Sequence, residues 1–192
     1  MAKKMDFKPD KPRSSLLSKL YLTQKQRRSL FKWVLYVAVL LVLSVVQDVL
    51  LCKVSLFGAT TELVPCGIFL ICLLEGTEVG SVFSLVASCL YLFSGSAAGN
   101  YVIVLITLIA FVTCFVRQSY FQAGFGAALL CTCGALMLYE LGVFSIAAFF
   151  GQTYTGRLGV FLLTALLTTL ATPILYPVLQ FIGKIGGETW KE

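Results

Sequence analysis

The feature that most constrains this chain is the length of its uncharged apolar runs. The longest covers residues 79–116, in which 38 consecutive positions carry no charge. One membrane-spanning helix needs about 20 apolar residues, so this run is long enough for two crossings. Residues 94–100 (SGSAAGN) interrupt it with a composition typical of a turn. We therefore predict two antiparallel membrane helices, over Val79–Phe93 and Ala98–Val116.

Composition indicates the same class for the whole chain. Hydrophobic residues make up 58% of the sequence and charged residues 12%, and the mean hydropathy is +0.91. These values are typical of an integral membrane protein and not of a soluble domain. Little polar sequence follows the first 30 or so residues, so no soluble catalytic domain is expected.

Four more apolar runs extend the pattern to an all-α, polytopic membrane helical bundle of about six transmembrane helices. The second apolar run begins near Phe57 or Glu62 and ends at Glu75. In the fifth apolar run, the helix either stops near Glu140 or continues to Phe150. Pro173 and Pro177 are expected to kink the last helix. The four runs lie at Trp33–Leu51, at the segment ending at Glu75, at Phe121–Glu140 and at Leu158–Ile182.

Charge sets the expected orientation. Ten of the 15 Lys and Arg residues lie between Lys3 and Lys32, directly before the first apolar run, which predicts a cytoplasmic amino terminus. With both termini in the cytoplasm, 13 basic residues face inward and only Lys53 and Arg157 face outward. The predicted organisation is a basic tail over 1–32, a transmembrane domain over 33–183 and a cytoplasmic tail over 184–192. The first tail is expected to attract anionic lipid headgroups, not nucleic acid, and residues 16–22 to form a short interfacial turn.

A membrane hairpin over Leu63–Gly95 is expected to organise the bundle. Its turn carries Glu75, Gly76 and Glu78, which we interpret as a solvated cytoplasmic turn. Its second arm places small residues at intervals of four, which stack on one helical face and allow another helix backbone to approach closely. This helix-packing seam serves either the protein's own bundle or a partner interface. Its members are Gly80, Ser84 and Ser88.

The sequence offers no obvious catalytic chemistry. It contains no histidine, which is the commonest metal ligand and general base, and its seven cysteines are interpreted as small packing residues. We therefore predict no enzymatic activity, no cofactor and no metal. Asp48 and Glu140 form a candidate polar membrane site, although both are expected to reach the outer interface.

Several residues carry a resemblance to a known family. In order along the chain these are Gln47 before a short outer segment, Leu56-Phe57-Gly58, Pro65 at the start of the second span, Glu75-Gly76, and Gly80 with the small residues that follow. The last span, TALLTTLATPILYPVL, is similar as well. Over about Trp33–Ile182 the chain resembles the bacterial rod shape-determining protein MreD family.

The resemblance implies a non-enzymatic subunit of the cell-wall elongation machinery in the bacterial cytoplasmic membrane. Such a subunit would pair with an MreC-like single-span protein. A peptidoglycan synthase and its transpeptidase would lie beside it, and the actin-like MreB filament would lie inside the cell.

The alternative is the substrate-binding S component of an energy-coupling-factor vitamin transporter, which a chain of this size and span number also resembles. In that case the outer ends of the spans would form a ligand cup. Its polar residues would be Asp48, Glu62, Asn100 and Glu140. A third candidate, a proton-coupled carrier, is less favoured because the spans show no clear buried pair of acid and base.

Overall fold

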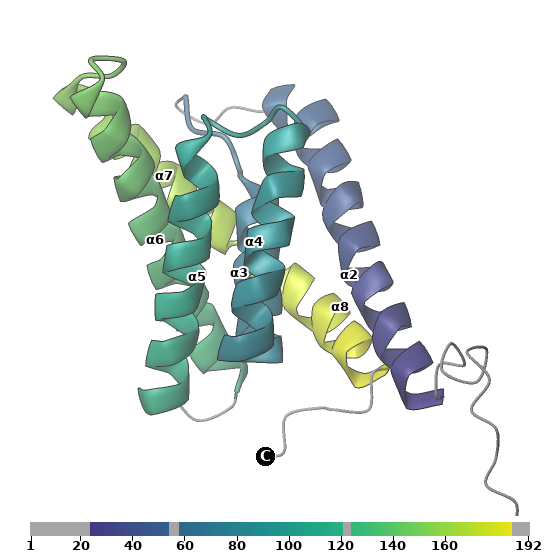
Figure 1. The fold of residues 1–192 in the computed structure, drawn as a ribbon. Coiled ribbons are helices and arrows are strands. Elements are labelled where there is room, and N and C mark those ends of the chain that lie inside the picture. Colours follow the sequence, from purple (N-terminus) through teal and green to yellow (C-terminus); the bar gives the residue numbers. More distant parts are fainter. Residues whose placement is uncertain (1–23, 54–57, 121–123, 186–192) are drawn as a thin grey trace, which may run out of the picture.

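In the computed structural model, which describes residues 24–53, 58–120 and 124–185, the apolar runs form a bundle of helices (Figure 1). The predicted all-α class is confirmed for these residues. The elements are, in order, α2 (Gln24–Val49), the 3-10 turn η1 (Leu51–Lys53), α3 (Leu63–Glu75), α4 (Thr77–Phe93), α5 (Tyr101–Tyr120), α6 (Phe125–Phe149), the 3-10 turn η2 (Thr155–Arg157), α7 (Leu158–Thr169) and α8 (Thr172–Ile185).

Helix α3 lies at the centre of the bundle. Ten consecutive residues, Val64 to Leu73, are buried, and α3 contacts every other α-helix that the structure describes. A helix that is apolar on all sides is stable only when other elements surround it. The first arm of the predicted hairpin is therefore the element on which the others pack.

From α2 to α7 successive helices run in opposite directions, and α8 continues the course of α7 after a bend (Figure 1). We call the end where α3 begins and α6 finishes the upper end, and the end where α3 finishes the lower end. Among the described residues, three helices are long and apolar enough to cross a membrane, or four if the bent segment formed by η2, α7 and α8 is one span. Helices α3 and α4 are apolar but shorter. With 13 residues, α3 is only about 20 Å long at 1.5 Å per residue.

The small residues of α4 are buried, and Gly80 lies against α3. A Cβ atom added to Gly80 would lie 2.8 Å from the carbonyl oxygen of Cys72, so the two backbones are nearly in contact. Ser84 and Ser88 are fully buried, and their hydroxyl groups donate to carbonyl oxygens of their own helix. All three residues are thus buried within this chain.

The turn between α3 and α4 depends on Gly76. Its φ of +91° lies in a region that residues with a Cβ atom rarely adopt. The chain therefore reverses within one residue, which brings α4 back along α3.

The upper part of the fold resolves two expectations from the sequence. Residues 94–100 do form the turn between α4 and α5, with Gly95 at a φ of +81°. Helix α6 continues without a break past Glu140 to Phe149. The long-helix alternative for the fifth apolar run is therefore the observed one.

The last apolar run is bent, but the break lies before the prolines. Helices α7 and α8 are inclined by 47° to each other, and the break falls at Leu170 and Ala171. Pro173 has no N–H group to bond to the preceding turn, and its ring crowds that turn, so the helix is interrupted ahead of it. Pro177 lies inside α8 without interrupting it.

The amino-terminal boundary differs from the predicted one. Helix α2 begins at Gln24, nine residues before Trp33, so part of the predicted basic tail is helical. Lysine and arginine are good helix formers, which explains why the helix extends through Arg27, Arg28 and Lys32. The interfacial turn expected over 16–22 lies outside the described residues.

The contact of Gly80 with Cys72 generates a stability prediction. Gly80→Ala should lower the free energy of unfolding by about 1–3 kcal/mol, because the added methyl group meets backbone atoms that move only if the helices separate. The measurement is thermal unfolding of the purified protein in detergent. Gly134→Ala is the matched control, since Gly134 is an exposed glycine in α6 where an added Cβ atom would have no neighbour within 4 Å. An unfolding temperature for Gly80→Ala equal to that of the wild type would contradict the close approach.

Candidate functional site

The upper end of the bundle contains a cavity of about 530 Å³. It lies where the segment before α3 meets α6, η2 and α7. Its polar lining includes two carboxyl groups from distant parts of the sequence, Glu62 and Glu140, and one cation, Arg157. Tyr154 and Phe161 contribute aromatic side chains.

The backbone of Glu62 is hydrogen-bonded to α7. Its N–H group donates to the Thr168 hydroxyl oxygen at 3.0 Å, and Thr168 donates to the Thr164 carbonyl oxygen at 2.7 Å. The hydroxyl groups of Tyr139 and Tyr91 face the Glu62 carboxyl group, but its Oε2 atom is buried with no hydrogen-bond partner.

The electrostatics of Glu62 follow from this position. Glu62 precedes α3 and lies outside the candidate membrane spans. Burial raises the pKa of the Glu62 carboxyl group above its usual range, and the Tyr139 and Tyr91 hydroxyl groups act in the opposite direction. Burial therefore favours the neutral form of this group.

Glu140 is buried, although from its position in the sequence we expected it to reach the outer interface. Its side chain lines the cavity from α6, and the residue is 3% exposed. The expectation was wrong because Glu140 is on the face of α6 that packs inward beside Tyr139, and not at the end of the helix. The carboxyl groups of Glu62 and Glu140 act on each other electrostatically.

Asp48 does not join Glu140. It is exposed near the end of α2 and accepts a hydrogen bond from the Ser96 hydroxyl at 3.1 Å. Asn100, a further member of the predicted cup, is exposed in the turn before α5. The structure thus brings Glu62 and Glu140 together and leaves Asp48 and Asn100 outside the cavity lining.

Gln47 links α2 to the start of α3. Its Oε1 atom accepts a hydrogen bond from the Val64 N–H group at 3.1 Å, which satisfies one of the N–H groups left unpaired at a helix start. In the sequence, Gln47 stood out only through the family resemblance. Arg157 was noted only as an outward-facing charge, since nothing in its local pattern placed it beside two carboxyl groups.

The lower end is closed by a buried ion pair. Lys32 Nζ lies 2.6 Å from Glu75 Oε2, and the Tyr36 hydroxyl donates to Glu75 Oε1 at 2.7 Å. The Lys32 and Glu75 side chains are only 6% and 10% exposed. The interpretation of Glu75 as part of a solvated turn was therefore wrong, because its partner lies 43 residues earlier in the chain. Glu78 is exposed, as expected.

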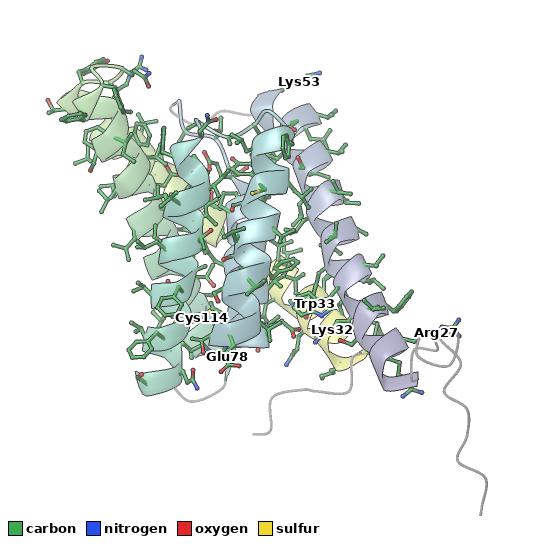
Figure 2. The ribbon with its side chains drawn as sticks, viewed as in Figure 1. Arg27, Lys32, Trp33, Lys53, Glu78 and Cys114 are labelled. Atoms are coloured by element: carbon green, nitrogen blue, oxygen red, sulfur yellow. The ribbon has the colours of Figure 1, made fainter. Side chains whose placement is uncertain are left out.

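Aromatic rings cover this ion pair. The Trp33 ring centroid lies 5.2 Å from that of Phe83 and 5.7 Å from that of Tyr36. Figure 2 shows Lys32, Trp33 and Glu78 toward the lower end and Lys53 at the opposite end. The low exposure of the Lys32 and Glu75 side chains strengthens the attraction between their charges.

Arg117 also lies at the lower end and is 3% exposed. Its Nη1 atom donates to the Leu73 carbonyl oxygen in the last turn of α3. A cation at this position satisfies a terminal carbonyl group and interacts favourably with the negative end of the helix dipole. Beside it lies a smaller cavity of about 370 Å³, lined in part by Glu75, Glu78 and Gln118.

The cysteines do not gather into a site. The six whose side chains are described are free thiols, four of them buried. Across residues 24–53, 58–120 and 124–185, no group of three or more His, Cys, Asp or Glu side chains is placed to hold a metal ion.

Comparison with known proteins found no matching family model, no matching curated protein and no matching solved structure. Function is therefore inferred from the contacts described above and from the residues that carry the resemblance.

The buried ion pair gives a second stability prediction. Lys32→Met should lower the free energy of unfolding by about 3–5 kcal/mol, because it leaves Glu75 buried without a counter-charge. Adding Glu75→Gln should recover most of the loss, since the amide is neutral and still accepts the Tyr36 hydrogen bond. Glu78→Gln is the matched control, an exposed carboxylate in the next helix. Thermal unfolding of the three variants checks this, and equal losses for the single and double variants would contradict it.

Proposed function

We propose that this chain is a non-enzymatic integral membrane subunit of the bacterial cell-wall elongation complex, similar to the MreD family. In this proposal it crosses the cytoplasmic membrane about six times with both termini inside. It packs laterally against an MreC-like single-span protein, near a peptidoglycan synthase and its transpeptidase.

One observation carries the proposal. Four of the residues that carry the family resemblance lie where α2, α3 and α4 meet. Gln47 bonds to the start of α3, Pro65 lies buried in its first turn, Gly76 makes the reversal, and Gly80 permits the close approach of α4. A resemblance located in the core of a fold is better support than one located in scattered apolar positions.

The lateral surface suits a partner helix or lipid. Large apolar side chains are exposed along the outer helices, among them Val42 of α2, Val82 of α4 and Phe115 of α5, at 62%, 67% and 58% exposure. In a soluble protein such a surface would promote aggregation. In a bilayer it is compatible with lipid and with lateral contact to a single-span protein.

Six crossings are supported by the alternating helix directions and by the charge pattern. Helices α3 and α4 are short for a lipid-exposed span, but α3 is enclosed by other helices and does not need to match the bilayer thickness by itself. Under this arrangement 13 of the 15 basic residues lie inside.

A second candidate is favoured by the upper cavity. An S component of a vitamin transporter binds its ligand near the outer ends of its spans, and the cavity with Glu62, Glu140 and Arg157 lies at that end. In this case the chain would assemble with transporter ATPases instead of an MreC-like protein.

The six-crossing arrangement predicts which positions can be labelled from outside. On a cysteine-free background, Tyr154→Cys in the exposed loop before η2 should react with a membrane-impermeant maleimide in intact cells. Ser119→Cys, exposed near the end of α5, is the matched control and should react only after lysis. Labelling of position 154 only after lysis would rule out the orientation.

The proposed role as a non-enzymatic subunit, which we call the scaffold role, predicts a change of cell shape and a specific partner. Depletion of the protein should widen the cells, and a tagged copy should co-purify the MreC-like protein. Asp48→Asn should restore width and co-purification, because Asp48 is exposed and the amide still accepts the Ser96 hydrogen bond. Cell width is measured by microscopy and the partner by immunoblot. Unchanged width together with co-purification of transporter ATPases would favour the second candidate.

A further inference from the structure

The upper cavity is lined by two carboxyl groups and one guanidinium group, and it has the size of a small-molecule site. Its volume of about 530 Å³ lies within the range of 300–1,000 Å³ that is usual for small-molecule sites. The lining comes from the segment before α3, from α6 and from η2 and α7.

Each of the two carboxyl groups in the cavity has oxygen atoms that the described residues leave without a hydrogen-bond donor. Glu140 is 3% exposed and faces the cavity, and within the described ranges its carboxyl group receives no hydrogen bond. The Oε2 atom of Glu62 is also buried and has no partner. Leaving buried carboxylate oxygens unsatisfied is costly, so this pair is complementary to a ligand that brings both N–H donors and positive charge.

Arg157 does not neutralise these carboxyl groups. Its guanidinium group lies over the Tyr154 ring, 5.3 Å from the ring centroid, and no ion pair with Glu62 or Glu140 is found among the described residues. Arg157 lines the cavity but is itself exposed, so it lies at the open side. A ligand can therefore meet two carboxyl groups inside the cavity and the Arg157 guanidinium group at its open side.

We propose that this cavity binds a small zwitterionic amine, such as an amino acid or a dipeptide. The ammonium group donates to Glu62 and Glu140, and the ligand carboxylate pairs with Arg157. The planar guanidinium group can donate two parallel hydrogen bonds to a carboxylate. Tyr154 and Phe161 supply aromatic surface beside the ligand. This proposal does not rest on the scaffold role, because every residue involved belongs to one chain.

The test uses the purified full-length protein in detergent. Free amino acids and dipeptides are screened by thermal shift, each beside its N-acetyl counterpart, which lacks the ammonium group, and its methyl ester, which lacks the carboxylate. We expect a shift with at least one free compound, none with its N-acetyl form, and at least tenfold weaker binding of the ester by calorimetry. Sodium chloride and calcium chloride alone should give no saturable shift.

Variants locate the site. Glu62→Gln with Glu140→Gln should weaken binding of the free compound at least tenfold, and Arg157→Gln should weaken it without affecting the methyl ester. Glu78→Gln, an exposed carboxylate at the lower end, should leave binding unchanged. Equal shifts with the free and N-acetyl compounds, saturation by an inorganic cation, or no shift in the whole panel would each overturn the proposal, and none of these outcomes depends on cell shape.

Discussion

The structure depends on enclosing one short apolar helix and satisfying the polar groups at both of its ends. Helix α3 is surrounded by the other helices, so water cannot complete its terminal hydrogen bonds. At the upper end Gln47 accepts from Val64, and Thr168 accepts from the residue before the helix. At the lower end Arg117 donates to the last turn. Side chains from α2, α5 and α7 thus satisfy polar backbone groups at the two ends of α3, which fixes where those helices lie.

The two ends of the bundle have different electrostatic character. At the lower end a cation and an anion meet at hydrogen-bond distance under aromatic rings, and the charges of Lys32 and Glu75 cancel. At the upper end two carboxyl groups lie together, and the cation beside them, Arg157, lies over the Tyr154 ring. The lower arrangement stabilises the fold as it stands. The upper one leaves its acceptors available to a molecule that enters the cavity.

Much of the fold could be predicted from local pattern. Uncharged run lengths indicated the helical class, the composition of residues 94–100 indicated a turn, and the spacing of Gly80, Ser84 and Ser88 indicated a packing seam. The environment of individual charges could not be predicted in this way. Glu75 is paired with a residue 43 positions away, and Glu140 faces inward because of how α6 packs. Both facts depend on the arrangement of helices in three dimensions, which hydropathy along one chain does not contain.

The single-residue reversal at Gly76 has a consequence for how the chain enters a bilayer during synthesis. Helix α3 has 13 residues and is too short to span a hydrocarbon core of about 30 Å unaided. The chain turns back at once into α4, and the hydrogen bond from Cys72 Sγ to the Gly80 carbonyl oxygen joins the two helices close to the turn. The short length of α3 and the one-residue turn at Gly76 favour entry of α3 and α4 into a bilayer together, as one hairpin.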